Sequence, residues 1–256
     1  MQKNGSKKCI ALLLFIVCTS FFIPNRKTHI WLIGDSTVCD QPLDRAPVTG
    51  WGTPFANYFD SSVIITNRAR DGRSTRTFIS EGLWQKVADS MKSGDYVLIQ
   101  FGHNDEASEP QYKDRYTSVP DYKVNLARFI TEIRDRKGNP VLVTPVTRMR
   151  FDKQGKVMET HKDYSAAVWD VGRAYHTPVI DLDSMSRNLL QQFGPDNAKF
   201  LYMYVDSLQN PHYPNGRKDW THFSEYGARR MAELVLAEIK RLQLPLAELA
   251  SKKPAP

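Results

Sequence analysis

Cysteine is scarce in this sequence, and its scarcity excludes one class of fold. Three cysteines among 256 residues cannot build the disulfide framework of a small secreted domain, and the odd number leaves at least one unpaired. Glycine and proline, at 14 and 15 residues, are too few for a collagen-like or low-complexity chain. With 41% hydrophobic and 25% charged residues, the composition indicates a soluble globular protein of one large domain or two small ones.

Motifs for cofactors and metals are also absent from the sequence. It contains no Gly-x-Gly-x-x-Gly fingerprint and no phosphate-binding Gly-Lys-Ser/Thr loop. It also has no cysteine pair, His-x-x-x-His or carboxylate cluster at the spacing that metal ligands require. We therefore expect no cofactor and no metal.

The first 20 residues differ from the rest of the chain. Three lysines precede an uncharged apolar run over Cys9–Val17, and small residues follow at 18–20. This pattern is typical of a secretory signal peptide. It predicts cleavage near residue 20 and export to the periplasm or the cell exterior.

Alternatives to cleavage remain open. Residues 21–23 extend the apolar run to about 15 residues, which allows a retained anchor but is shorter than the ~20 of a spanning helix. A lipid-modified Cys18 is disfavoured, because bulky Val17 stands where lipoprotein signals usually carry a small residue.

Removal of the leader changes the charge and the cysteine count. It takes away three lysines and no acidic residue, which lowers the net charge from +7 to +4. It leaves Cys39 alone, so the mature protein has no pair with which to form an internal disulfide. The remaining charge gives little support to a nucleic-acid partner, and we expect no nucleic acid and no stable membrane insertion of the mature protein.

Residues 28–250 contain no repeat or charge block and are expected to form a single domain, followed by a polar, proline-rich tail at 251–256 that is predicted to be disordered. Short, nearly continuous apolar runs alternate with amphipathic segments in this domain. Continuous apolar strands are typical of a parallel sheet covered on both faces. The predicted strands are 30–33, 63–66, 96–101, 141–144 and 179–182; the predicted helices are 83–91, 122–136, 164–175, a short one after 183, and 224–242.

This alternation predicts a doubly wound α/β sheet, in which ligands bind beyond the carboxyl ends of the strands. Chemically useful residues follow those predicted ends: Ser36 after the first strand, Gly72 after the second and Asn104 after the third. Asp219 and His222 immediately precede the last helix, where one tight loop could present both. These residues also have a plainer interpretation: Ser36 and Asn104 as turn residues, and the segment that begins at Asp219 as the start of the last helix.

These motifs, in this order, resemble the SGNH (GDSL-type) hydrolase superfamily, and within it the rhamnogalacturonan acetylesterase group. The resemblance extends from about Ile30 to Ala228. It rests on the following segments: Gly-Asp-Ser-Thr at 34–37, Gly-Trp-Gly at 50–52, 67–74, Gly-His-Asn-Asp at 102–105, Thr-Pro-Val-Thr-Arg at 144–148 and Asp-Trp-Thr-His-Phe-Ser at 219–224. It implies a three-layer α/β/α fold with a flavodoxin-like five-stranded parallel sheet.

The resemblance also implies a serine esterase. Ser36 would be the nucleophile, His222 the base and Asp219 the residue that orients it. The backbone N–H groups of Ser36 and Gly72 and the amide of Asn104 would form the oxyanion hole. The implied substrate is an O-acetylated plant cell-wall polysaccharide, acetylated rhamnogalacturonan or pectin first, with acetylxylan, a short acyl lipid or a thioester as alternatives. A non-catalytic carbohydrate-binding protein is a further alternative, but binding alone would not require all of these residues.

Several neighbouring residues have two interpretations. His103 is expected to be structural or to support a site residue, without a catalytic role of its own, and Asp35 either bonds the loop backbone or lies on the surface. Arg148 and Arg150 could meet an acidic sugar or pair with nearby carboxylates. A set of aromatic residues could stack on sugar rings but more often packs in a core, and 202–218 is expected to be a loop at the cleft edge; the aromatic residues are Trp51, Tyr202, Tyr204 and Trp220.

Overall fold

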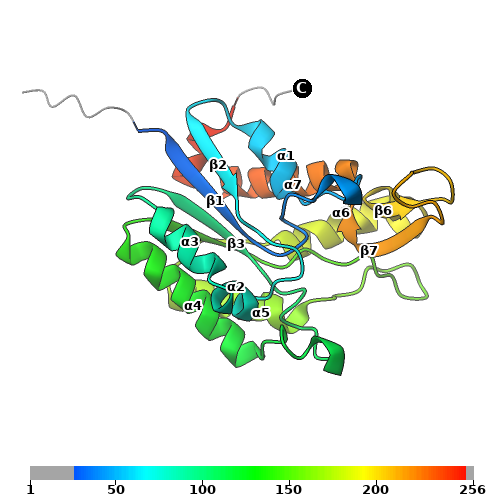
Figure 1. The fold of residues 1–256 in the computed structure, drawn as a ribbon, viewed down its shortest axis with the longest axis horizontal. Helices are drawn as coiled ribbons and strands as arrows, with labels where there is room; N and C mark the ends of the chain where they lie inside the picture. Colours follow the sequence, from blue (N-terminus) through cyan, green and yellow to red (C-terminus); the bar gives the residue numbers. More distant parts are fainter. Residues whose placement is uncertain (1–25, 252–256) are drawn as a thin grey trace, which may run out of the picture.

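A five-stranded parallel sheet forms the centre of the molecule. The computed structural model describes residues 26–251. The strands lie in the order β2-β1-β3-β4-β5 and all pair in parallel (Figure 1). Their bounds are β1 Thr28–Gly34, β2 Val63–Asn67, β3 Tyr96–Gln100, β4 Asn139–Val143 and β5 Val179–Ile180. The predicted doubly wound α/β sheet with flavodoxin-like strand order is confirmed.

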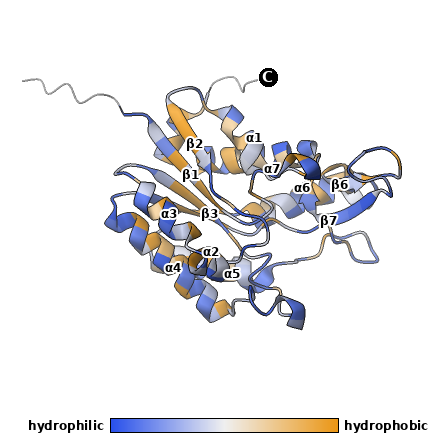
Figure 2. Ribbon diagram, in the orientation of Figure 1, coloured by the Kyte–Doolittle hydropathy of each residue, from blue (hydrophilic) through white to orange (hydrophobic). Residues whose placement is uncertain are grey.

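The central strands are apolar on both faces because helices cover both. In β1, Ile30 and Leu32 pack into one core, whereas Trp31 and Ile33 pack into the other. Successive side chains of a strand point to opposite faces, so a strand buried on both sides shows a continuous apolar run. Figure 2 shows hydrophobic colour along β1, with helices on both sides of the sheet that carry hydrophilic colour as well.

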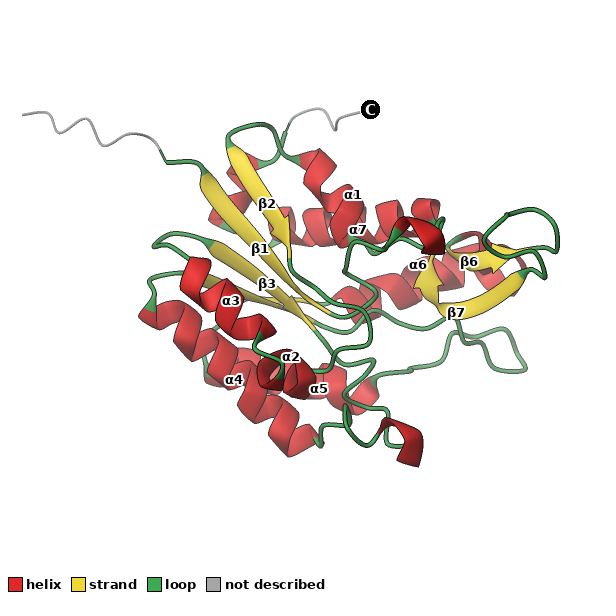
Figure 3. Ribbon diagram, in the orientation of Figure 1, coloured by secondary structure: helices red, strands yellow, loops and turns green. Residues whose placement is uncertain are grey.

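Seven α-helices within residues 26–251 make up the two outer layers (Figure 3). One layer contains α2 Thr75–Ser80, α3 Leu83–Ser90, α4 Val119–Asp135 and α5 Lys162–Ala174. The other contains α1 Gly52–Phe55, α6 Leu182–Asn197 and α7 Glu225–Arg241. Serine side chains cap three of the helices: Ser74 on α2, Ser118 on α4 and Ser224 on α7. Such caps satisfy backbone N–H groups that have no partner within the helix.

The structure corrects several predicted boundaries. The fifth strand ends at Ile180 rather than at 182, because Asp181 caps α6 and Leu182 already belongs to that helix. The helix expected to be short after 183 extends to Asn197, across a kink at Gly194. Helices α1 and α2 were not predicted, since each is too short to establish an amphipathic period.

A second, two-stranded antiparallel sheet forms the two ends of the segment expected as a loop at 202–218, and residues 206–216 connect its strands. It is formed by β6 Tyr202–Val205 and β7 Arg217–Phe223. The pair projects beyond the carboxyl ends of the parallel strands (Figure 1). It therefore brings the 219–222 segment to the edge of the sheet where ligands are expected.

The signal peptide predicted at 1–20 lies outside the described residues, as does the predicted tail apart from Ser251. Within the described part of the chain, no helix is both long and apolar enough to cross a membrane.

Candidate active site

Ser36 lies in a tight turn directly after β1. The carbonyl of Asp35 accepts hydrogen bonds from the backbone N–H groups of Val38 and Cys39. The Asp35 carboxylate is fully buried, and its Oδ1 accepts bonds from the Thr37 backbone N–H and hydroxyl at 2.9 and 2.8 Å. Asp35 thus bonds the loop backbone and is not a surface carboxylate. This network holds Ser36, which is 6% exposed, at the end of the strand.

A neighbouring strand braces the same turn. The Gln100 side chain, at the end of β3, donates a 2.6 Å hydrogen bond to the Thr37 hydroxyl. Its own carbonyl accepts a 2.7 Å bond from the indole N–H of Trp51. Because strands β1 and β3 are paired, the side chain of one fixes the turn that follows the other.

His222 and Asp219 reach the site from β7. Asp219 Oδ2 lies 2.8 Å from His222 Nδ1, and Oδ1 accepts bonds from the backbone N–H groups of Thr221 and His222. They occupy a strand rather than the tight loop expected. The three-residue spacing places the two side chains in contact because the Asp219 side chain bends toward the backbone N–H groups of Thr221 and His222.

The charge of Asp219 is stabilised from two sides. Burial alone would raise the pKa of its carboxyl, but the hydrogen bond from His222 and the adjacent Arg217 guanidinium outweigh that effect and hold the pKa well below its ordinary value. Arg217 Nη2 lies 2.6 Å from Asp219 Oδ2. The carboxylate is therefore ionised at neutral pH and accepts the proton-bearing Nδ1 of the imidazole.

The other nitrogen of that imidazole faces the serine. His222 Nε2 lies 2.9 Å from Ser36 Oγ. With Nδ1–H donated to Asp219, Nε2 is the acceptor for the Ser36 hydroxyl. A serine, an imidazole and a carboxylate joined in this order can transfer the hydroxyl proton as the oxygen attacks a carbonyl.

Gly72 and Asn104 lie beside this line of three residues. Gly72 has a φ of +73°, a backbone conformation that residues other than glycine rarely adopt. Asn104 donates a 3.0 Å hydrogen bond from Nδ2 to the carbonyl of Arg73, as the plainer turn interpretation expects. An amide has two N–H donors, so this bond orients the group and leaves the second donor for a ligand.

These residues surround one small cavity, which we call the nucleophile cavity. Its volume is about 300 Å³. Every residue along it is polar or charged apart from a glycine, so it suits a small acyl group on a polar alcohol better than a long lipid chain. The lining residues are Ser36, Arg45, Asp71, Gly72, His103, Asn104, Arg115, Arg148, Asp219, Thr221 and His222.

His103 lines the cavity and belongs to a buried cluster. Its ring centroid lies 4.3 Å from that of His161, and its Nδ1 lies 3.4 Å from Asp35 Oδ2. Burial lowers the pKa of His103 to about 4, so its ring is neutral at neutral pH. It is thus a packed structural neighbour of the nucleophile turn.

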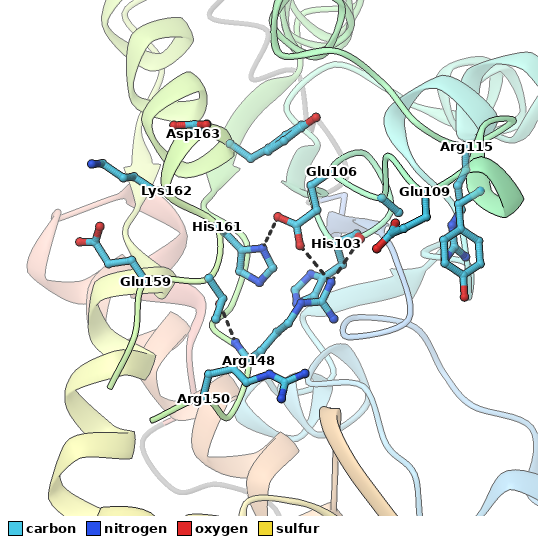
Figure 4. Close-up of a pocket in the computed structure, with 14 residues that line it drawn as sticks. His103, Glu106, Glu109, Arg115, Arg148, Arg150, Glu159, His161, Lys162 and Asp163 are labelled. Carbon is cyan, nitrogen blue, oxygen red and sulfur yellow. Dashed lines mark hydrogen bonds and ion pairs between the residues drawn. The ribbon is translucent and has the colours of Figure 1, made fainter. Parts of the chain in front are cut away.

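The two arginines singled out after β4 have different surroundings. Arg148 pairs with Glu106 at 3.0 Å (Figure 4). It also donates a 2.6 Å bond to the Thr221 hydroxyl. It follows the interpretation of pairing with a nearby carboxylate, and it links the β7 segment to the centre of the fold. Arg150 instead lies over the ring of Trp220, at 5.1 Å from the centroid.

The aromatic residues do not form one wall. Trp51 and Tyr202 are buried in the core, so stacking on sugar is wrong for these two. Trp220 is 41% exposed and lies edge-on to Tyr204, with ring centroids 6.3 Å apart. Of the four, this pair is what a bound ligand could reach.

Sequence reasoning missed three arginines that contribute to the site: Arg45 and Arg115, which line the nucleophile cavity, and Arg217, which pairs with Asp219. Arg217 had a local signal, because side chains two residues apart on a strand share one face. Arg115 had none, because it lies in an irregular segment after the 3-10 helix Pro110–Tyr112. Among residues 26–251 there is also no cluster of histidine, cysteine and carboxylate side chains that could hold a metal ion.

Comparison with known proteins agrees with this geometry. The GDSL-like lipase/acylhydrolase family matches residues 32–230. Rhamnogalacturonan acetylesterase RhgT of Bacillus subtilis (strain 168) is 39% identical over 222 residues, covering 87% of this chain and 94% of the relative. The probable rhamnogalacturonan acetylesterase YesY of the same organism is 33% identical, with 88% and 98% covered.

A solved structure shares the fold. The crystal structure of protein YxiM from Bacillus subtilis superposes with a TM-score of 0.73 at 27% identity, over 86% of this chain but 58% of that longer chain. The family match and the two relatives together show that this chain belongs to the GDSL-like lipase/acylhydrolase family and is a serine-type carboxylic ester hydrolase.

Proposed function

We propose that the protein removes O-acetyl groups from a plant cell-wall polysaccharide, with acetylated rhamnogalacturonan as the preferred substrate. The observation that carries this proposal is the hydrogen-bonded line Ser36–His222–Asp219 at the wall of a small polar cavity. The relatives named rhamnogalacturonan acetylesterase support the choice of substrate. The polar lining supports an acetylated sugar over a lipid ester.

The reaction follows from the positions of these groups. Ser36 Oγ attacks the acetyl carbonyl carbon while its proton passes to His222 Nε2. The negative charge on the carbonyl oxygen is held by the N–H groups of Ser36, Gly72 and Asn104, and donors of this kind typically contribute 10²–10³-fold each. Asp219 stabilises the imidazolium that has formed.

The intermediate then collapses in two stages. The C–O bond to the sugar breaks, and the sugar oxygen takes the proton from His222, which leaves an acetyl group on Ser36. Water enters the cavity, gives a proton to His222 Nε2 and attacks the acetyl carbon. Acetate leaves as Ser36 Oγ recovers its proton. No cofactor takes part in this scheme.

The test has two parts. Hydrolysis of 4-nitrophenyl acetate is measured for the wild type and for Ser36→Ala, where we expect the variant to fall to the rate of the uncatalysed control. Acetate release is then compared among acetylated rhamnogalacturonan, acetylated homogalacturonan and acetylxylan. Equal 4-nitrophenyl acetate rates for the two proteins contradict the catalytic assignment. Release from acetylxylan but not from the pectic polymers contradicts the substrate.

We also propose that the mature protein acts outside the cytoplasm. The support is the basic, apolar and small-residue order of residues 1–20. Amino-terminal sequencing of the protein recovered from outside the cytoplasm tests this, and a retained Met1 contradicts cleavage.

A further inference from the structure

A second and larger cavity lies beside the nucleophile cavity and shares a wall with it. Its volume is about 710 Å³, and His103, Arg115 and Arg148 line both cavities. It lies between the segment around the 3-10 helix Pro110–Tyr112 and the segment 148–164 (Figure 4). A polysaccharide whose acetyl group lies at Ser36 can therefore extend past the shared residues into the larger cavity.

Two of the three arginines around the nucleophile cavity are neutralised by the protein itself. Arg45 Nη1 lies 2.8 Å from Asp71 Oδ2. Arg148 Nη2 lies 3.0 Å from Glu106 Oε1. A guanidinium already paired with a carboxylate offers little net charge to a ligand, so neither side chain is well placed to attract an anion.

Arg115 is the exception. No carboxylate within residues 26–251 forms an ion pair with it; Glu109 lines the larger cavity but makes no such pair. Its guanidinium carbon lies 4.0 Å from the ring centroid of Tyr112, and its buried Nε has no hydrogen-bond partner. A Cβ built on Gly72 would lie 3.9 Å from Arg115 Nη1. The unpaired cation is thus next to the proposed oxyanion hole.

The chemistry of this group selects its ligand. A guanidinium keeps its charge at every physiological pH and presents a planar set of donors that matches a carboxylate. The Tyr112 ring holds that plane in place by a cation–π contact. A carboxylate that arrives at Arg115 would do so beside the carbonyl that Ser36 attacks. In cell-wall polysaccharides the group of this kind is the carboxylate of a uronic acid.

We propose that Arg115 binds the carboxylate of a uronic acid residue in the substrate, at or next to the sugar whose acetyl group reaches Ser36. The proposal rests on the proposed function and assigns the distinction between acidic and neutral polysaccharides to this one side chain. Neutral polymers such as acetylxylan lack the group that Arg115 recognises.

The catalytic experiment uses one acetylated pectic oligosaccharide in two forms, with its carboxylates free and with them methyl-esterified. Acetate release gives kcat/KM for each form, and their ratio reports recognition of the carboxylate. We expect Arg115→Gln to lower this ratio by about 10-fold, mainly through KM, as the loss of one partly exposed charge-assisted hydrogen bond predicts. Arg115→Lys, which keeps the charge but loses the planar fork, should retain part of the ratio.

Arg229→Gln is the matched control. Arg229 lies on α7, is exposed, lines neither cavity and makes no ion pair in the described part of the chain. It removes the same unit charge, so it should leave the ratio at the wild-type value. A fall as large as that of Arg115→Gln would mean that long-range charge explains the effect, and it would overturn the proposal.

The remaining outcomes are separated by a binding measurement. Calorimetry compares the affinity of non-acetylated oligogalacturonate for Ser36→Ala with that for Ser36→Ala/Arg115→Gln, where we expect a loss of about 10-fold. Equal affinities, or an unchanged kcat/KM ratio in Arg115→Gln, overturn the carboxylate site. Wild-type protein that hydrolyses no acetyl ester overturns the proposed function alone, because Arg115-dependent binding would still support the site.

Discussion

Replacing Asp219 with asparagine gives the sharpest test of the proposed proton transfer. The carboxylate now accepts the Nδ1 proton of His222 at 2.8 Å. The asparagine carbonyl can still accept the two backbone N–H bonds that Oδ1 receives from Thr221 and His222. Its amide N–H₂ would then face Nδ1 and donate to it. The imidazole would carry its proton on Nε2, where it cannot accept the proton of Ser36.

The expected loss combines two effects. The charge-assisted bond that steadies the imidazolium contributes about 1.5–3 kcal/mol. The change of tautomer adds the cost of restoring the reactive form, and a carboxamide in the corresponding place of a serine protease costs about 10⁴ in kcat. We therefore expect Asp219→Asn to lower kcat by about 10³–10⁴-fold, which corresponds to roughly 4–5.5 kcal/mol.

The assay is 4-nitrophenyl acetate hydrolysis, with thermal unfolding followed by circular dichroism to show that the variant is folded. Asp71→Asn serves as the control, because Asp71 lines the same cavity but pairs with Arg45 rather than His222. It should lose less than about 10-fold if the tautomer matters more than the charge. A folded Asp219→Asn variant within 10-fold of wild type would refute the reasoning, as would equal losses in both variants.

Three further predictions concern neighbouring residues. Asn104→Ala should lower kcat for 4-nitrophenyl acetate by about 10²–10³-fold, and a loss below about threefold would remove Asn104 from the oxyanion hole. Burial raises the pKa of Asp105 to about 7, so the folded state binds more protons than the unfolded state between about pH 4 and pH 7. The free energy of unfolding of the wild type should therefore fall relative to that of Asp105→Asn as pH rises through this range, by at most about 1.4 kcal/mol per pH unit. The same pH dependence for both proteins, measured by urea unfolding at pH 5 to 8, would contradict this. Gly227→Ala should destabilise the protein by about 2 kcal/mol or more, since the added Cβ would clash with the Leu201 carbonyl oxygen. An unchanged melting temperature would contradict this.

The parallel sheet was predictable because burial on both faces leaves a strong local pattern. The run at 30–33 lies within β1, and the run at 141–144 overlaps β4. Both are continuously apolar because helices cover the sheet on both sides. Boundaries were less accurate where capping decides them. Asp181 ends β5 and starts α6 through its own side chain, and hydrophobic periodicity carries no signal for that contact.

The β6–β7 pair was not predictable from periodicity. The first residues of the β7 strand are alternately half-buried and exposed, and the strand pairs with β6 across a long intervening segment. Its carbonyl groups also accept hydrogen bonds from the backbone N–H groups of Met149 and Thr49. The paired positions Lys218 and Phe223 lie on either side of Asp219 and His222. Local sequence identified Asp219 and His222 by their spacing but assigned them to a loop.

Motif order and strand–helix alternation were sufficient to identify the α/β architecture and to select Ser36, Asp219 and His222 as candidates, because those signals are local. Tertiary structure alone decided which arginines carry an uncompensated charge. Arg148 is paired with Glu106, whereas Arg115 has no carboxylate partner in the described chain. A side chain's net charge toward a ligand depends on neighbours that are distant in sequence, so only the folded arrangement could decide it.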